Sequence, residues 1–107
     1  MDISVLMNLG FTRAEAIVYL YLLELGAVKV GVLIKKTGLQ SSTIHNTLNS
    51  LVDKGFVTYI FRGKIKIYQA IEPKIVLKNF KEKEQKFEQL IPELEEKKRL
   101  AKQKTQA

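Results

Sequence analysis

The sequence predicts an α+β fold that is mainly helical, with one small β hairpin and a long helix at its C-terminal end. Two amphipathic segments with helical spacing meet at Gly38, as is typical of a tight turn between two helices. Two runs rich in β-branched and aromatic residues follow, separated by a short turn that contains glycine. The rest of the chain is charged and has high helix propensity. This order of elements predicts a winged helix-turn-helix with a two-stranded β wing and a long C-terminal helix.

The N-terminal part of the chain predicts two helices. Residues 3–9 form a short apolar segment of helical character. Thr12 and Glu15 have the spacing of a capping box, in which each side chain accepts a hydrogen bond from the other residue's backbone amide. The helix that they begin is expected to stop at Gly26. Its core-facing residues are expected to be Ala16, Tyr19, Leu20 and Leu23, while Tyr21 and Leu22 make the helix apolar almost all round.

The two helices of the helix-turn-helix are predicted on either side of Gly38. Residues 30–37 form the first, and Gly38 suits the left-handed conformation of a helix C-cap. Ser41 or Ser42 is expected to cap the second helix, which Gly55 ends. One side of this second helix is apolar and carries Ile44, Leu48, Leu51 and Val52. The opposite side is polar and carries Ser42, His45, Asn46, Asn49 and Asp53.

The wing is predicted from two short strands. Residues 56–60 and 65–70 are rich in residues that favour strands, and residues 62–63 form the turn between them. Lys64 and Lys66 alternate with isoleucines along the second strand. Because successive side chains of a strand point to opposite faces, one face is expected to be basic and the other apolar.

The C-terminal segment predicts a separate helical unit. Pro73 is suited to the first turn of a helix, whereas Pro92 must either kink the helix or begin a new one. We therefore divide the chain into a winged helix-turn-helix domain, residues 1–72, and a C-terminal helix, residues 73–107.

Apolar residues recur along the C-terminal helix with heptad spacing. They are Leu77, Phe80, Phe87, Ile91, Leu94 and Ala101, of which the first five are the predicted dimerisation residues; Glu84 and Lys98 interrupt the pattern. A lone helix would leave the phenylalanines of this row in water, so the row either pairs with a second copy or folds back onto the first helix of the same chain. We favour a homodimer, because a helix that rises about 1.5 Å per residue soon extends beyond a domain of this size.

The net charge of +7 is unevenly distributed. Residues 1–28 carry a net charge of −2, residues 29–71 carry +6 and residues 72–107 carry +3. The positive charge is therefore concentrated on the helix-turn-helix and wing, as a surface that binds phosphates requires.

Several function classes are disfavoured by composition. The chain has no cysteine, no glycine-rich phosphate loop and no nucleophile beside a base. His45 is the only histidine, and a lone histidine is a poor metal site. We expect no enzyme activity, no cofactor and no metal. With neither a signal peptide nor an apolar run long enough to span a bilayer, we expect a cytoplasmic, nucleoid-associated protein without a membrane partner.

These features predict double-stranded DNA as the partner. Short polar side chains on a helix reach base edges in the major groove, and asparagine can pair with adenine through two hydrogen bonds. The predicted recognition residues are Ser41, Ser42, Thr43, His45, Asn46 and Asn49. The predicted wing and phosphate contacts are Lys29, Lys35, Lys36, Lys54, Arg62, Lys64 and Lys66. The same residues also suit an ordinary solvated helix face and charged protection of an exposed strand edge.

The sequence resembles the N-terminal DNA-binding domain of the archaeal TrmB family of winged-helix regulators. The resemblance extends over roughly residues 5–75, and the segments that carry it are Leu9-Gly10-Phe11-Thr12, Glu15-Ala16, Tyr19-Leu20, Gly38-Leu39, Ser42 with Ile44, Leu48 with Ser50-Leu51, Lys54-Gly55-Phe56-Val57 and Lys66-Ile67-Tyr68-Gln69-Ala70. It implies regulation of transcription by operator binding, usually as a dimer.

This chain departs from the family pattern in two ways. Family members often carry arginines near the start of the recognition helix, where this chain has Ser41 and Thr43. Larger members also have a C-terminal sugar-binding domain, which is not part of this sequence, so no small-molecule effector is predicted.

Two alternatives to a sequence-specific regulator follow from the same residues. An architectural, chromatin-like protein would use the same fold and dimer but bind mainly through phosphates, as the missing recognition-helix arginines suggest. A winged helix used for protein contacts in a transcription assembly would explain the uncharged recognition face and the very apolar helix after Thr12.

Overall fold

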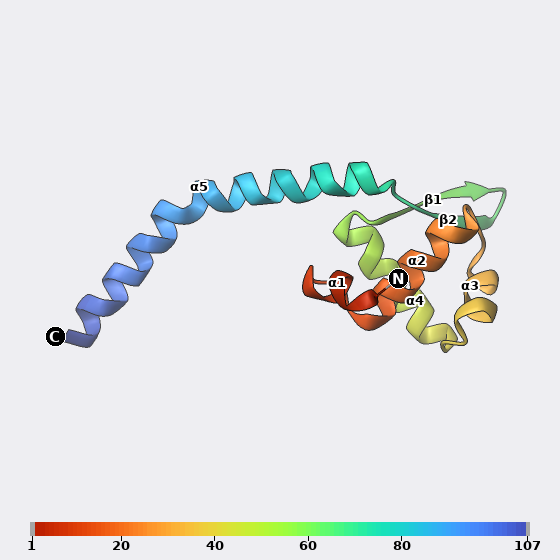
Figure 1. Cartoon of the computed structure of the whole chain (residues 1–107), viewed down its shortest axis with the longest axis horizontal. Helices are drawn as coiled ribbons and strands as arrows, with labels where there is room; N and C mark the ends of the chain where they lie inside the picture. Colours follow the sequence, from red (N-terminus) through yellow and green to blue (C-terminus); the bar gives the residue numbers. More distant parts are fainter. Residues whose placement is uncertain (1, 107) are drawn as a thin grey trace. The chain divides into compact units, whose positions relative to one another are not determined.

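The structure, a computed structural model, describes residues 2–106 and the side chains of residues 2–102. The chain divides into two compact units, Met1–Glu72 and Pro73–Ala107, of which Met1 and Ala107 themselves lie outside the described residues. The mainly helical α+β fold, with a two-stranded wing and a long C-terminal helix, is confirmed (Figure 1). Its elements in chain order are α1 (Ile3–Asn8), α2 (Arg13–Leu25), α3 (Val30–Thr37), α4 (Ser41–Lys54), β1 (Val57–Arg62), β2 (Ile65–Ala70) and α5 (Pro73–Gln106).

Helix α2 begins with the predicted capping box and ends at Gly26, as expected. The prediction of its core face was partly wrong. Leu23 is 41% exposed and Leu20 is half-buried, whereas Leu22 is almost completely buried. The buried face follows Glu15, Ala16, Val18, Tyr19 and Leu22. Leu22 continues this stripe at helical spacing, and Leu23 lies about 100° further round the helix.

A left-handed glycine joins α3 to α4. Gly38 has φ +70°, and its amide donates a hydrogen bond to the Ile34 carbonyl. The expectation that Ser41 or Ser42 caps α4 was wrong. The cap residue is Gln40, in extended conformation and without a side-chain capping bond, because the helix already begins at Ser41.

The buried side of α4 fixes this helix in the first unit. Ile44, Leu48 and Leu51 are completely buried, as predicted, and Val52 is half-buried. Thr47 is also buried. The helix packs against α2, α3 and β1. Its opposite side is consequently left for other contacts.

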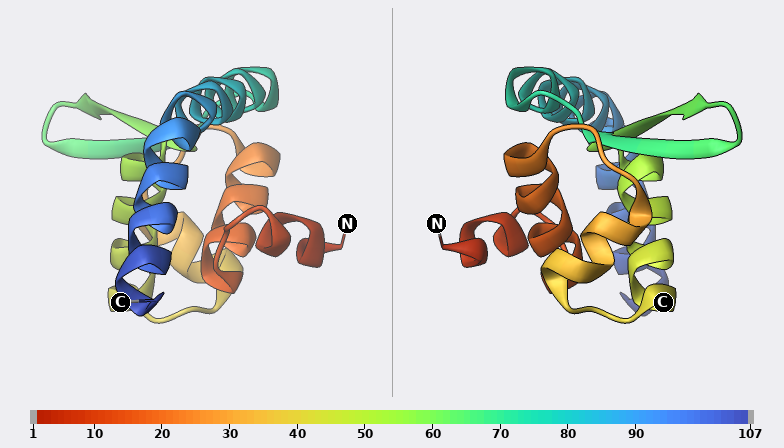
Figure 2. Two further views of the ribbon diagram at one scale, coloured as in Figure 1. Left: turned by 90° about the vertical axis from the view of Figure 1, so that its left-hand side faces the viewer. Right: turned by 90° about the vertical axis from the view of Figure 1, so that its right-hand side faces the viewer.

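The wing is an antiparallel hairpin that projects from the helices of the first unit (Figure 2). Its register runs from Val57 opposite Ala70 to Arg62 opposite Ile65. The predicted turn at residues 62–63 was wrong by one position, since Arg62 ends β1 and the turn consists of Gly63 and Lys64. Gly63 has φ +61°, which glycine adopts without the steric cost of a side chain.

Aromatic rings close the core behind the hairpin. Phe11 stacks on Phe56 with ring centroids 4.3 Å apart, and Tyr19 lies against both rings. The Tyr19 hydroxyl donates a hydrogen bond to the Ile71 carbonyl at 3.1 Å. Burial raises the pKa of Tyr19. These contacts tie the start and end of the first unit to α2.

Helix α5 continues through Pro92, so no new helix begins there. Its axis changes direction along its length (Figure 1), as expected of a helix that loses a backbone hydrogen bond at an internal proline. No helix within residues 2–106 combines the length and the apolar character needed to cross a bilayer.

The turn between α3 and α4 yields a prediction. Gly38→Ala should destabilise the protein by about 1–2 kcal/mol, because alanine is strained at positive φ even though no atom lies within 4 Å of the added Cβ. Gly31→Ala is the matched control: it lies inside α3, has equal space and no positive φ, and should leave stability unchanged or raise it by up to about 1 kcal/mol. Urea unfolding measures both; equal midpoints for the two variants would contradict the prediction.

Candidate nucleic-acid interface

The exposed side of α4 holds the predicted recognition residues. Ser41, Ser42, His45, Asn46 and Asn49 are all exposed, and Thr43 is half-buried at the edge of this side. At about 100° per residue, the five exposed residues fall on one side of the helix. The structure therefore brings them together as one surface of short polar side chains.

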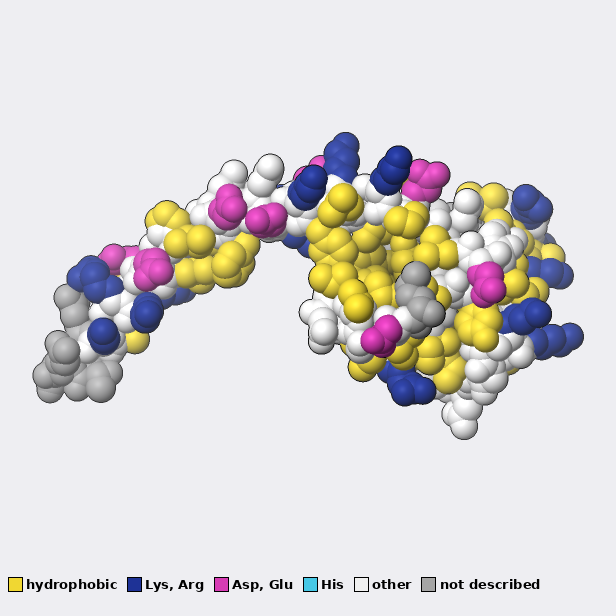
Figure 3. Space-filling view, viewed as in Figure 1, with side chains coloured by type: hydrophobic (Ala, Val, Ile, Leu, Met, Phe, Trp, Pro, Cys, Tyr) yellow, Lys and Arg dark blue, Asp and Glu magenta, His cyan; other side chains and the backbone are white. Residues whose placement is uncertain are grey.

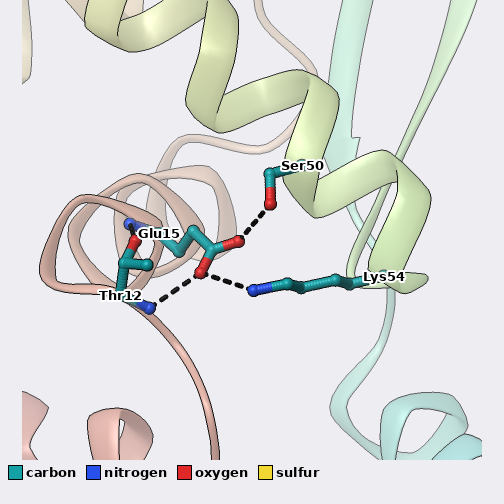
Figure 4. Close-up of polar contacts among 4 residues, drawn as sticks. All are labelled: Thr12, Glu15, Ser50 and Lys54. Atoms are coloured by element: carbon teal, nitrogen blue, oxygen red, sulfur yellow. Dashed lines mark hydrogen bonds and ion pairs between the residues drawn. The ribbon is translucent and has the colours of Figure 1, made fainter.

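A buried carboxylate attaches the other end of α4 to α2 (Figure 4). Glu15 is only 2% exposed. Its carboxylate accepts hydrogen bonds from the Ser50 hydroxyl at 2.6 Å, the Thr12 amide at 2.7 Å and the Lys54 ammonium at 2.9 Å. The Glu15 amide in turn donates to the Thr12 hydroxyl at 3.1 Å. One side chain thus completes the cap of α2 and fixes the C-terminal half of α4.

These contacts keep Glu15 ionised. Burial opposes ionisation and raises the pKa of Glu15, but the hydrogen bonds from Ser50 and Thr12 and the hydrogen bond and charge of Lys54 outweigh it. Together they lower the pKa from 4.5 to about 2. The carboxylate therefore stays charged throughout the physiological range.

Lys54 has a structural partner in the folded chain. It was predicted to contact phosphate, but its ammonium pairs with the buried Glu15 carboxylate. The Lys54 side chain is 39% exposed, so part of it still meets solvent. Because its charge is balanced by Glu15, we assign Lys54 first to the scaffold that holds α4.

The other predicted phosphate contacts lie at the surface. Lys29, Lys35, Lys36, Arg62 and Lys64 are exposed, on α3, its N-cap and the hairpin. In Figure 3, most of the Lys and Arg side chains on the visible face of the first unit gather at the edge formed by α3 and the hairpin. This edge is a basic surface that can face a polyanion.

Lys66 is held against the hairpin. It is half-buried, and its ammonium lies over the Tyr59 ring, 4.0 Å from the centroid. The ring thus attracts the cation through its negative face. The expectation of one basic and one apolar face on this strand was too simple, because Tyr59 and Phe61 share the face of Lys66.

The apolar side chains of the wing were missed by sequence reasoning. Tyr59, Ile60, Phe61 and Ile65 are all exposed. Their signal was available, since residues 59–61 form an unbroken apolar run next to a turn, but it was interpreted only as strand propensity.

Two observations on the described residues bear on small-molecule and metal binding. Lys29, Gly31, Val32 and Lys35 line a depression of about 250 Å³, smaller than the roughly 300–1,000 Å³ typical of ligand pockets. In the part of the chain that the structure describes, no three His, Cys, Asp or Glu side chains come together to hold a metal ion.

Helix α5 carries a row of exposed apolar side chains. Of the predicted dimerisation residues, Leu77, Phe87, Ile91 and Leu94 are exposed and Phe80 is half-buried. Leu90, which sequence reasoning missed because it lies outside the heptad positions, is 46% exposed and widens the row. Figure 3 shows a group of hydrophobic side chains midway along α5.

Comparison with protein families matches residues 6–74 to the family described as "Sugar-specific transcriptional regulator TrmB". A curated relative is the HTH-type sugar sensing transcriptional regulator TrmBL1 of Pyrococcus furiosus, which is 38% identical over 77 residues. The match covers 72% of this chain and 22% of the relative, so the chain spans less than a quarter of that protein's length.

Solved structures show the same fold. One is the structure of TrmBL2, described as an archaeal chromatin protein with a novel mode of DNA binding. Its TM-score is 0.66 at 27% identity, and the match covers 86% of this chain and 34% of that one. A MarR family protein from Bacillus stearothermophilus has a TM-score of 0.60 at 19% identity and covers 97% of this chain and 81% of that one. At 19% identity the second likeness concerns the fold alone.

The Glu15 network yields a second prediction. The Glu15 carboxylate takes up a proton near pH 4.5 in the unfolded chain but only near pH 2 in the folded protein. The ionised Glu15 carboxylate therefore stabilises the folded state by up to about 3 kcal/mol above pH 4.5, and this stabilisation is lost as the pH falls to about 2. Glu15→Gln should lower stability at pH 7 by about 2–3 kcal/mol and flatten this acid dependence.

Glu96→Gln is the matched control for Glu15→Gln. Glu96 also accepts from a basic side chain, Arg99, but both are exposed on α5, so its loss should not change stability measurably. Urea unfolding at pH 7, 4.5 and 3 distinguishes the two variants. Parallel pH profiles for Glu15→Gln and the unmodified chain would contradict the role given to this carboxylate.

Proposed function

Because the chain belongs to the TrmB family of transcriptional regulators, we propose that it binds duplex DNA as a homodimer and regulates transcription from a specific operator. In this proposal α4 is the recognition helix and the β1–β2 hairpin is the wing. The role is one of binding, without catalysis, cofactor or small-molecule effector. The protein would act on the nucleoid, in the cytoplasm.

The exposed polar side of α4 is the observation on which the proposal depends. Asn46 and Asn49 lie on that side, and each can pair with adenine through its amide in the major groove. The other side of the helix is locked by buried apolar residues and by the Glu15 network. A recognition helix needs this combination, since base contacts discriminate only when the side chains are held in register.

The basic edge supplies the second requirement. Lysines on α3 and its N-cap, together with Arg62 and Lys64 on the wing, provide cations on two elements adjoining α4. Contacts of this kind release counterions from DNA, so affinity should fall steeply with salt. They set the affinity and orientation, while α4 supplies the sequence preference.

The apolar row of α5 supports the homodimer. Leu77, Phe87, Ile91 and Leu94 would remain in water on an isolated helix, and a second copy of the same row is self-complementary. A symmetric dimer would place two copies of α4 about 34–36 Å apart, one turn of DNA, on a pseudo-palindromic site.

A second candidate function is an architectural, chromatin-like role. No lysine or arginine occurs in residues 41–53, which include the whole exposed side of α4 up to Asp53. TrmBL2, whose structure is similar over 86% of this chain, is described as a chromatin protein. In this role the basic edge would bind phosphates of any sequence, and α4 would contribute little discrimination.

A salt titration by fluorescence anisotropy tests the two candidates. One duplex carries the DNA upstream of this protein's own gene, and the other is a scrambled duplex of equal length and composition. Preference for the first by about a thousandfold or more supports the regulator. Equal affinity with a steep salt slope supports the architectural role. Failure to bind either duplex at low salt would contradict both and favour a winged helix used for protein contacts.

The recognition role of α4 yields a third prediction. Asn49→Ala should weaken binding to the preferred duplex by about 1–3 kcal/mol and leave binding to the scrambled duplex unchanged. Lys36→Ala, the control on the basic edge, should weaken both equally and reduce the salt slope by about one. An Asn49→Ala variant that loses affinity for both duplexes alike would argue against base recognition at this position.

The homodimer yields a fourth prediction. Leu94→Glu should convert the dimer to a monomer in sedimentation velocity, because it buries a charge in the apolar row. Leu100→Glu is the matched control: Leu100 is 46% exposed, close to the 43% of Leu94, but lies on another side of α5. A Leu94→Glu variant that stays dimeric would exclude the α5 interface, as would an unmodified protein that is itself monomeric.

A further inference from the structure

The tip of the wing carries more exposed apolar surface than phosphate binding requires. Phe61 is 64% exposed, Ile60 55% and Ile65 46%. All three lie within the last three residue pairs of the hairpin, next to the Gly63–Lys64 turn. Ile60 and Ile65 lie on one face of the hairpin and Phe61 lies on the other, so the tip exposes apolar side chains on both faces. Exposed apolar surface of this kind is typical of a site that is covered in a complex.

Phe61 is held by a row of aromatic rings that leads back to the core. Its ring lies edge-on to that of Tyr59, with centroids 5.8 Å apart, and Tyr59 contacts Tyr68 at 5.7 Å. Tyr68 is 3% exposed, and its backbone forms two hydrogen bonds with Val28. Phe61 is therefore an exposed ring that is linked to the core through its contact with Tyr59.

The charge around this ring identifies its partner as a polyanion. Residues 55–71 contain three basic residues and no acidic one. Arg62 follows Phe61 directly, and Lys64 lies in the turn. The ammonium of Lys66, the cross-strand partner of Phe61, lies over the Tyr59 ring beside it. An apolar ring flanked by cations on a narrow hairpin fits the minor groove, where an apolar side chain can enter between base steps and cations can contact the phosphates on either side.

We propose that Phe61 is an apolar wedge that the wing presses into the minor groove, where it opens one base step and bends the duplex. The proposal rests on the proposed function, because it requires that the wing contact duplex DNA. Arg62 and Lys64 would hold the flanking phosphates while the ring enters the step. Pyrimidine–purine steps, which unstack most easily, would be preferred. The wing would then contribute selectivity that does not depend on hydrogen bonds to bases.

The test measures DNA shape as well as affinity, with the full chain throughout. A duplex with donor and acceptor dyes at its ends reports bending by energy transfer. The fluorescence of 2-aminopurine placed beside a TA step reports unstacking. The unmodified chain should increase both signals on binding. Phe61→Ala should remove at least about half of each change at saturation, and affinity should fall by no more than about tenfold, because phosphate contacts supply most of it.

Two variants make the result specific to the ring. Phe61→Leu keeps a bulky apolar side chain and should retain most of the bend. Ile60→Ala removes a similarly exposed apolar side chain from the opposite face of the same strand and should leave the bend unchanged. Thermal unfolding of Phe61→Ala, which loses an exposed side chain, should be close to that of the unmodified chain.

The outcomes separate this inference from the proposed function. Tight binding without bending or unstacking would overturn the wedge and leave DNA binding intact, as would a Phe61→Ala variant that bends DNA fully. A Phe61→Ala variant that loses self-association while its DNA binding and bending persist would make this face a protein interface and also overturn the wedge. Absence of binding to any duplex would reject the proposed function, and the wedge with it.

Discussion

The position of α4 depends on the buried carboxylate of Glu15. This one side chain accepts hydrogen bonds from Thr12 in its own helix cap and from Ser50 and Lys54 on α4, which lie 35 and 39 residues further along the chain. A buried charge that lost these donors would be strongly destabilising, because nothing else would compensate its removal from water. The carboxylate therefore adds directional contacts to the apolar packing of α4, and the two together determine which side of α4 is exposed.

Sequence reasoning found the local half of this network and missed the tertiary half. Thr12 and Glu15 are three residues apart, so their capping box follows from helix geometry alone. The bonds to Ser50 and Lys54 depend on how α2 crosses α4, which the sequence does not state. Lys54 was accordingly assigned to DNA, as any lysine near a recognition helix would be, until the structure gave its charge a partner inside the protein.

The predicted apolar face of β2 was incomplete for a related reason. Ile65 and Ile67 have the same side-chain type and lie on the same face of β2, yet Ile65 is 46% exposed and Ile67 only 8%. The difference is position along the hairpin, whose base packs against the helices while its tip projects beyond them. Periodicity identifies the face of a strand but not how far the supporting layer extends beneath it. The exposed apolar tip, and with it the candidate wedge at Phe61, becomes visible only in the three-dimensional arrangement.

The distribution of charge separates affinity from discrimination in this fold. Cations lie on α3 and the wing, whereas residues 41–53 of α4 carry no cation, and Asp53 at the end of its exposed side carries a negative charge. Phosphate contacts are blind to sequence, so α4 adds specificity only through short neutral groups that must approach the bases closely. Such groups gain little at long range and lose their contacts when the helix shifts by an ångström. A neutral recognition helix therefore needs rigid support, which the Glu15 network provides. If α4 were held less firmly, the same basic edge on α3 and the wing would bind all duplexes alike. The rigidity of the contact between α2 and α4, rather than the number of cations, would then determine whether the protein binds a specific sequence or any duplex.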